Sequence, residues 1–350
     1  MAKRFCAQLP WRSVCAGALL LFILLPVVGN SASEQENLRP GTGIDTRSIP
    51  YKIVYESLRE AGGNKNWELI MINADGSNPV NLTKTVNVSE IYPHVSPDGT
   101  RICFEGEEGA GNEKVRSVYC MNIDGTNRVK VAHNARQACW SPDSQTIAFL
   151  KAEFDRYAIQ DYATKGVYFY DVKSGKTTEH SNCAKLYHLY NLCWSPDGTW
   201  FAATVHGGMD FKHADLAFPA NGPEVYDLTP FRVTGCRPDF SLDGKNITWG
   251  ATDWDLCVGS IDFSSGKPQV TNVRTVVKCD KEHEVYHSDF SPDGRYIAFS
   301  YGPEANEMGA GEAPGWNICI SDLTGKWVQV TTDGNHNKEP DWVPIRTAKP

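Results

Sequence analysis

The sequence predicts an all-β fold, a six-bladed β-propeller, and three observations lead to this prediction. A phrase close to Trp-Ser-Pro-Asp-Gly recurs every 45 to 54 residues. An apolar segment precedes each copy and another follows it. A second Asp-Gly or Ser-Gly corner then closes a third apolar run, as at Asp75-Gly76 and Asp124-Gly125. Four short antiparallel strands in a period of about 50 residues are typical of a propeller blade.

The Pro-Asp-Gly corner is the best defined element of the repeat. Proline presets φ for the turn, aspartate bonds the backbone ahead of it, and glycine accepts the positive φ that closes a tight connection. The strand before the corner is named A, and the next three are named B, C and D. Copies of the corner occupy residues 93–99, 138–144, 192–198, 238–244 and 288–294, with a truncated copy at 340–344.

The strands at the two ends of the repeat region predict how the ring closes. The first unit begins at a B strand, residues 51–56, and the last unit ends on an A strand around Asp341 and Trp342. Pairing these strands would complete a sixth four-stranded blade from both ends of the chain and leave no free sheet edge. We therefore expect one propeller domain over residues 51–345. Strands C and D of the fourth unit, between Thr204 and Cys236, are not assigned from the sequence.

The two corners together carry a family resemblance. The Trp-Ser-Pro-Asp-Gly corner at 194–198 and the Met-Asn-Ile-Asp-Gly corner at 121–125 resemble the TolB-like β-propellers of the Trp-Asp-like Pro-Asp repeat family. The resemblance implies a propeller fold and docking within an envelope assembly. It says little about chemistry, because such propellers serve protein docking, substrate gating and, in some lyases, catalysis.

The first 32 residues have the pattern of a signal peptide. They carry Lys3, Arg4 and Arg12 and no acidic residue, and an apolar run follows at residues 14–28. That run is shorter than the roughly 20 residues of a membrane span. We expect a secreted or periplasmic protein of the bacterial cell envelope, with an uncleaved membrane anchor as the alternative.

The remaining chain is divided into a polar linker at 33–50, the propeller, and a tail at 346–350. Removal of the three basic residues of the signal would lower the formal net charge from −8 to −11. No cluster of lysine and arginine with stacking aromatic residues is present, so nucleic acid is not an expected partner. An acidic chain is also not expected to bind anionic membranes once the signal is removed.

Six of the nine cysteines after the signal recur at equivalent positions of the repeat and are predicted to be free thiols in the core. These are Cys103, Cys120, Cys139, Cys193, Cys257 and Cys319. Cys183, Cys236 and Cys279 do not follow this pattern. A disulfide between Cys236 and Cys279 is one hypothesis for them.

The long connections are predicted to share one face of the disc. Because the strands alternate in direction, the B-to-C and D-to-A connections lie on one face and the tight corners on the other. Long loops on a rigid scaffold are where binding residues usually lie. We expect a monomer that binds a protein, a peptide or an extracellular glycan on this long-loop face, whose longest connections are residues 58–66, 107–116, 151–165, 206–223 and 302–315.

The A strands begin on the same face, next to the central channel. Aligning the copies predicts a ring of polar side chains at the channel mouth, formed by Tyr92, Gln137, Asn191, Arg237, His287 and Glu339, with His94 and His188 as further candidates. These side chains could hold a carboxylated sugar or a peptide terminus. The alternative is that they bond neighbouring blades and water. If a divalent metal binds, its candidate ligands are His94, His287, Asp289 and Asp341.

The sequence favours a non-catalytic binding module, and no catalytic residue or resident cofactor is assigned. His283 and His287 match the His-Glu-x-x-His pattern of zinc proteases, but the segment is predicted to be a strand, which would place the two imidazoles about 13 Å apart. The alternative function is a polysaccharide lyase acting on uronates, with a metal at the channel mouth. Such propeller lyases have seven blades, whereas six are predicted here.

Overall fold

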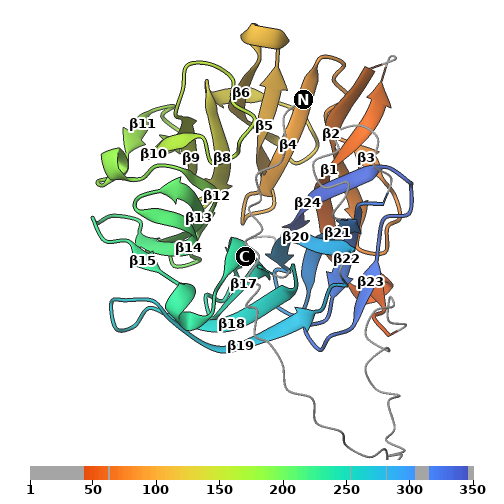
Figure 1. Cartoon of the computed structure of the whole chain (residues 1–350). Helices are drawn as coiled ribbons and strands as arrows, with labels where there is room; N and C mark the ends of the chain where they lie inside the picture. Colours follow the sequence, from red (N-terminus) through yellow and green to blue (C-terminus); the bar gives the residue numbers. More distant parts are fainter. Residues whose placement is uncertain (1–42, 62–63, 253, 281, 304–314, 346–350) are drawn as a thin grey trace, which may run out of the picture. The chain divides into compact units, whose positions relative to one another are not determined.

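The structure is a computed structural model that describes residues 43–61, 64–252, 254–280, 282–303 and 315–345. Within these residues, six four-stranded antiparallel sheets are arranged as blades around a central channel (Figure 1). The predicted fold class is therefore confirmed. The predicted signal at 1–32 and tail at 346–350 lie outside the described residues, as does most of the linker. Among the described residues, no helix is both long and apolar enough to cross a bilayer.

Each blade takes its strands from the channel outward in the order A, B, C, D. Blade 1 contains β24 (His336–Val343), β1 (Lys52–Ala61), β2 (Asn64–Asn73) and β3 (Val80–Asn81). Blade 2 contains β4 (Val88–Val95), β5 (Arg101–Glu108), β6 (Val115–Asn122) and β7 (Val129–Ala132). Blade 3 contains β8 (Ala135–Trp140), β9 (Thr146–Ala152), β10 (Thr164–Asp171) and β11 (Thr177–Glu179).

The other three blades follow the same order. Blade 4 contains β12 (Leu189–Trp194), β13 (Trp200–Gly208), β14 (Phe211–Pro219) and β15 (Tyr226–Asp227). Blade 5 contains β16 (Gly235–Phe240), β17 (Asn246–Ala251), β18 (Leu256–Asp262) and β19 (Gln269–Val277). Blade 6 contains β20 (His283–Phe290), β21 (Ile297–Pro303), β22 (Asn317–Ser321) and β23 (Trp327–Gln329). The described residues also contain four short 3-10 helices, η2 (Thr46–Ser48) before β1 and, in the connections between strands, η3 (Gly111–Glu113), η4 (Cys183–Lys185) and η5 (Thr229–Phe231).

Blade 1 is assembled from both ends of the repeat region, as predicted. The last strand, β24, pairs antiparallel with β1, and Trp342 lies opposite Ile53 in the register. The Ser57 hydroxyl donates a hydrogen bond of 2.6 Å to Asn337 Oδ1 across this pair. The ring is therefore closed by non-covalent pairing of residues 280 positions apart.

The geometry of the Ser-Pro-Asp-Gly corner, which is the same in five blades, explains why this string repeats. In blade 2, the Ser96 hydroxyl donates to Asp98 Oδ1 at 2.6 Å and accepts from the Arg101 N–H at 2.9 Å. The fourth residue, Gly99, has φ +66°. The same serine-to-aspartate bond occurs in four more corners, at Ser141–Asp143, Ser195–Asp197, Ser241–Asp243 and Ser291–Asp293. Each aspartate is thus used to shape a turn.

Apolar side chains fill the spaces between adjacent blades. One cluster joins Cys139 and Leu150 of blade 3 to Phe201 and Phe218 of blade 4. The fully buried Trp249 anchors the next cluster, between blades 4 and 5. All six cysteines that were predicted to be core residues are buried, and none forms a disulfide.

Neither Cys236 nor Cys279 forms a disulfide, so the hypothesis of a bond between them is wrong. Cys236 lies on the inner strand β16, whereas Cys279 follows the outer strand β19 of the same blade. The Cys279 thiol instead donates to the Trp254 carbonyl at 2.9 Å.

Two of the predicted long loops are hairpins. In blade 4, β13 and β14 stay paired up to Gly208 and Phe211, so only Met209 and Asp210 lie in the turn between them. Both of these residues have positive φ, 52° and 66°, which is the conformation of a type I′ turn. Residues 58–66 are likewise mostly strand, in β1 and β2. Strands C and D of the fourth unit, which the sequence left unassigned, are β14 and β15.

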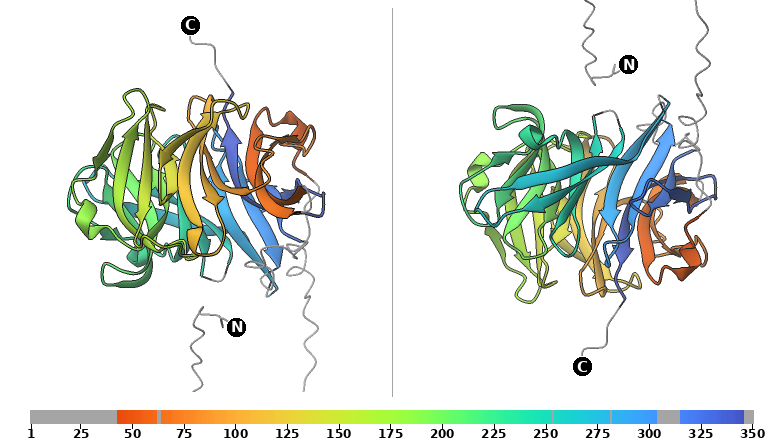
Figure 2. Two further views of the ribbon diagram at one scale, coloured as in Figure 1. Left: turned by 90° about the horizontal axis from the view of Figure 1, so that it is seen from above. Right: turned by 90° about the horizontal axis from the view of Figure 1, so that it is seen from below.

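Two true long loops remain on the face where the A strands begin, as seen from the side in Figure 2. The loop 109–114 connects β5 to β6, and the loop 153–163 connects β9 to β10. The connection between β21 and β22 lies largely outside the described residues. The loop between β9 and β10 is the one that reaches the channel mouth.

Candidate functional site

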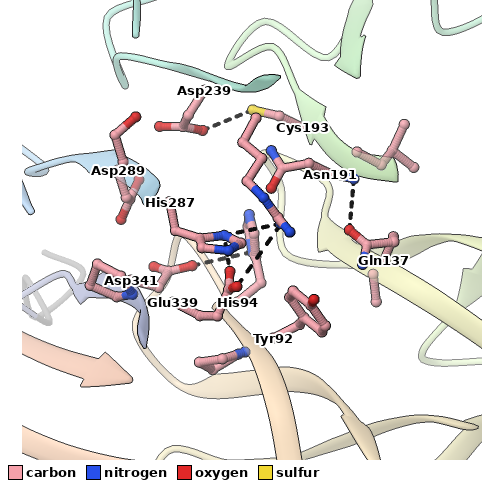
Figure 3. Close-up of a pocket in the computed structure, with 16 residues that line it drawn as sticks. Tyr92, His94, Gln137, Asn191, Cys193, Asp239, His287, Asp289, Glu339 and Asp341 are labelled. Carbon is pink, nitrogen blue, oxygen red and sulfur yellow. Dashed lines mark hydrogen bonds and ion pairs between the residues drawn. The ribbon is translucent and has the colours of Figure 1, made fainter. Parts of the chain in front are cut away.

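A polar cavity of about 90 Å³ lies on the axis of the ring and is lined by residues from all six A strands (Figure 3). Seven of the eight predicted binding residues meet there: Tyr92, His94, Gln137, Asn191, Arg237, His287 and Glu339. His188 does not. Its ring nitrogens contact the Gly207 carbonyl at 2.9 Å and Glu153 Oε2 at 3.1 Å instead.

Each A strand contributes its ring residue through a bulge. The six aligned residues all have left-handed backbone conformations, with φ between 46° and 60°, and none is glycine. The pairing of each A strand with its B strand shifts register at this point. A left-handed conformation costs a non-glycine residue about 1–2 kcal/mol. Six equivalent residues in this conformation indicate that each bulge is held by its surroundings.

Side chains from neighbouring blades hold the bulges by accepting their backbone N–H groups. The Tyr92 N–H donates to Glu56 Oε2 at 2.8 Å, and the Gln137 N–H donates to Glu105 Oε1 at 2.8 Å. The Arg237 N–H donates to Thr204 Oγ1 at 2.8 Å. The ring residues therefore bond neighbouring blades through their backbones, and some side chains do the same, since Gln137 Oε1 accepts the Asn191 N–H at 2.6 Å.

Arg237 is the charged centre of the cavity. Its side chain is only 5% exposed. Its guanidinium lies 3.1 Å from His287 Nδ1, 3.3 Å from Asp161 Oδ2 and 4.0 Å from Glu339 Oε1. Three aromatic rings surround the guanidinium at 4.8 to 5.7 Å: Tyr92, Tyr190 and Tyr286. Cation–π contact and charge pairing together offset the desolvation of this buried cation.

Asp161 is a site residue that sequence reasoning missed. It lies in the loop between β9 and β10, yet its carboxylate accepts hydrogen bonds from Tyr92 Oη at 2.6 Å and from Arg116 at 2.9 Å. Arg237 is its third partner. The only sequence signal was the length of this loop, because a loop residue has no counterpart in the other repeats.

Burial and charge pairing act in opposite directions on the carboxyl groups of the site. Burial raises the pKa of Glu56 and of Glu105 to about 7. Burial also raises the pKa of Glu339 well above its ordinary value, although Arg237 opposes this. For Asp161, burial is outweighed by Arg116 and Arg237, which lower its pKa. Asp161 is therefore the carboxylate of this group most strongly held in its ionised form.

A second ring of side chains lies two residues further along each A strand. Here Asp341 accepts the Val95 N–H at 3.1 Å, and Asp289 accepts the Trp342 N–H at 2.9 Å. His94 Nδ1 faces the Trp140 N–H at 3.5 Å, and burial lowers the pKa of this imidazole to about 4. These side chains connect each blade to the next, so this ring has a structural role.

Comparison with solved structures identifies the architecture. TolB from Acinetobacter baumannii superposes with a TM-score of 0.61 at 16% identity, covering 84% of this chain and 67% of that one. A putative TolB from Agrobacterium tumefaciens gives a TM-score of 0.54 at 14% identity, covering 84% of this chain and 99% of that one. The fold is that of a TolB-like β-propeller.

This TolB-like fold is also shared by proteins of other kinds. The hydrazine synthase of Kuenenia stuttgartiensis gives a TM-score of 0.58 at 11% identity, covering 84% of this chain and 46% of that one. No family model and no curated protein sequence matches the chain. Its function must therefore be argued from its own residues.

The candidate metal ligands of this TolB-like propeller do not form one cluster. His94 Nδ1 lies 3.9 Å from Asp341 Oδ2, but His287 is in the other ring, where it contacts Glu339. In the described part of the chain, no three or more histidine, cysteine or acidic side chains are arranged to hold a metal ion. The His-Glu-x-x-His segment is strand β20, as predicted, and its first histidine bonds Asp280 at 2.8 Å.

Proposed function

We propose that this TolB-like propeller is a non-catalytic docking module of the bacterial cell envelope, secreted or periplasmic. It binds a protein or peptide segment at the channel mouth, on the face that carries the β9–β10 loop. The observation that carries the proposal is the convergence of six strained, non-glycine bulge residues on one polar cavity around Arg237. Strained backbone that is repeated around a cavity is a common property of functional sites.

The shape of the cavity favours recognition of a peptide group. About 90 Å³ is room for several water molecules, or for a single side chain or chain terminus. A partner would therefore place one residue in the cavity and contact the surrounding loops with the rest of its surface. Phe154 and Ile159, exposed by 42% and 56%, offer apolar contacts on the β9–β10 loop, whose Asp161 reaches Arg237.

The alternative function, a uronate lyase, gains less support from the site. The two imidazoles that could serve as a base are both engaged, His287 with Arg237 and Glu339, and His94 with Trp140. Burial lowers the pKa of both, well below the ordinary value for His287. The ring also has six blades, whereas the lyase resemblance implies seven.

Site-specific photocrosslinking tests the docking proposal. A photoreactive amino acid replaces Ile159 at the channel mouth, and in a matched control it replaces Leu242, which is 48% exposed on an A-to-B corner of the opposite face. Both variants are expressed in the native envelope and irradiated. We expect a discrete crosslinked species at position 159 and none at position 242. Equal crosslinking at both positions, or none at position 159, would refute docking at the channel mouth.

A further inference from the structure

We propose that Arg116, Arg237 and Tyr92 form a carboxylate receptor that Asp161 occupies as an internal ligand, and that a carboxylate of a bound peptide replaces Asp161. The inference rests on the proposed docking function and names the chemical group that the site recognises. It also assigns a role to the β9–β10 loop, which would close the receptor until a partner arrives.

The receptor holds one carboxylate with three donors from two distant blades. Asp161 Oδ1 accepts from Arg116 of β6 at 2.9 Å. Asp161 Oδ2 accepts from the Tyr92 hydroxyl at 2.6 Å and from Arg237 of β16 at 3.3 Å. Two guanidinium groups and a hydroxyl converging on one carboxylate are the arrangement by which proteins recognise anionic groups.

The donors belong to the rigid scaffold, whereas the carboxylate belongs to a loop. The side chains of Arg116 and Arg237 are 8% and 5% exposed and lie on strands of blades 2 and 5. Asp161 comes from the eleven-residue loop of blade 3, which has no helix or strand of its own. A loop anchored at a few points separates from a rigid strand at lower cost than two strands separate from each other.

Charge balance favours a replacement anion. If Asp161 left without one, two buried guanidinium groups would lose the carboxylate that they share. Glu107 remains bonded to Arg116 at 2.9 Å, while Glu105 and Glu339 lie 4.0 Å from Arg116 and Arg237. At 4.0 Å neither Glu105 nor Glu339 is within hydrogen-bond distance of the guanidinium that it faces, so neither replaces the hydrogen bonds of Asp161. An incoming carboxylate restores the pairing.

The cavity also has donors that Asp161 does not reach. Arg237 Nε and His287 Nε2 are buried, line the cavity, and have no hydrogen-bond partner in the described part of the chain. Buried polar atoms of this kind are normally satisfied by water or by a ligand. A peptide carboxylate that entered the cavity beside Arg237 would bring its neighbouring backbone carbonyl within range of these groups.

Several contacts keep the loop in place in the absence of a ligand. The buried Arg136 donates to the carbonyls of Gln160 at 2.7 Å and Ala158 at 3.0 Å. The Tyr157 hydroxyl donates to Glu107 at 2.6 Å. These contacts position Asp161 without using its carboxylate. Removal of that carboxylate should therefore open the receptor while leaving the loop attached.

The test uses the variant Asp161→Ala, with Asp161→Asn as a second variant and Asp155→Ala as a control for charge loss in the same loop. The first probe is sodium acetate, compared with sodium chloride at equal ionic strength by thermal unfolding. We expect acetate to raise the unfolding midpoint of Asp161→Ala in a saturable way. Wild type and Asp155→Ala should respond equally to the two salts. An absence of any acetate-specific effect in both Asp161 variants would overturn the receptor.

The second probe is a labelled octapeptide of neutral residues with a free C-terminal carboxylate, measured by fluorescence anisotropy. Its C-terminal amide, a blocked peptide with one internal aspartate, and galacturonate form the other arms. We expect the Asp161 variants to bind a carboxylate peptide about tenfold more tightly than wild type, because the internal competitor is gone. The amide should not show this gain. Equal affinities for wild type and variants, or a gain confined to galacturonate, would reject a peptide carboxylate as the ligand.

The two proposals fail in distinguishable ways. If position 159 crosslinks a partner but the Asp161 variants show no preference for carboxylates, docking stands and the carboxylate receptor is wrong. If the variants bind carboxylate peptides but position 159 gives no crosslink, docking at the channel mouth is wrong.

Discussion

Replacement of Trp342 should show how strongly the non-covalent closure of the ring depends on β24. The side chain of Trp342 is 3% exposed, packs edge-on against Tyr51, and donates from Nε1 to the Asp289 carbonyl at 3.1 Å. An indole buries on the order of 200 Å². At about 25 cal/mol per Å² this burial is worth about 5 kcal/mol. We therefore expect Trp342→Ala to lower the free energy of unfolding by about 3–5 kcal/mol, the usual range for such a truncation.

Trp140 provides a matched control in blade 3, where a tight corner of the chain joins the A strand β8 directly to the B strand β9. It is 2% exposed and its Nε1 donates to the His94 carbonyl at 3.1 Å, which is the equivalent bond between blades 3 and 2. Denaturant unfolding should give similar losses for Trp140→Ala and Trp342→Ala. Hydrogen exchange should differ, since only β24 lacks a tight corner to its B strand. Amides of β1 and β24 should exchange faster in Trp342→Ala, and no such local effect should occur in β8 of Trp140→Ala. Uniform exchange in both variants would refute this account of the closure.

Two further predictions concern buried titratable groups. Burial raises the pKa of Asp215 to about 7 from the ordinary 3.8, so the folded state binds more protons than the unfolded state between these values, and stability falls as pH rises from about 4 to 7. Asp215→Asn keeps an acceptor for the Thr204 hydroxyl. Its free energy of unfolding, measured by urea denaturation, should depend less on pH than that of wild type and should be higher above pH 7. Parallel pH profiles for the two proteins would contradict this. Burial raises the pKa of the Cys279 thiol, which is nevertheless the one partly exposed thiol of the nine described. Cys279 should therefore react slowly with a maleimide in the native protein, but before any other of these thiols. Mass spectrometry of tryptic peptides identifies the labelled cysteine, and earlier labelling of another of these thiols would contradict the structure.

The sequence was sufficient to predict most of the fold because the repeat encodes its own geometry. The corner needs a serine that both donates and accepts, an aspartate that accepts, and a residue that tolerates positive φ, and these requirements recur as a readable string. The inner ring was predictable for the same reason, since the register of the A strands fixes which residues face the channel. Arg237 and Glu339 occupy this same position in two blades, and their side chains approach to 4.0 Å across the ring.

What the sequence could not predict lies outside the repeat. Asp161 has no equivalent in other blades, so its approach to Arg237 depends on the path of one loop. The connection at 206–223 was expected to be a long loop, since strands C and D were not assigned between Thr204 and Cys236, but pairing between β13 and β14 continues as far as Gly208 and Phe211. His188 was a candidate by residue type alone, and its contacts with Glu153 and Gly207 place it away from the cavity.

The split composition of blade 1 has a consequence for biosynthesis. Strands β1 to β3 are translated first among the strands, yet their innermost partner, β24, is translated last. Until then β1 presents an unpaired backbone edge, which is a template for wrong pairing with other chains. The nascent polypeptide therefore depends on protection of that edge, by a chaperone or by rapid completion of translation, for as long as five other blades are still being made.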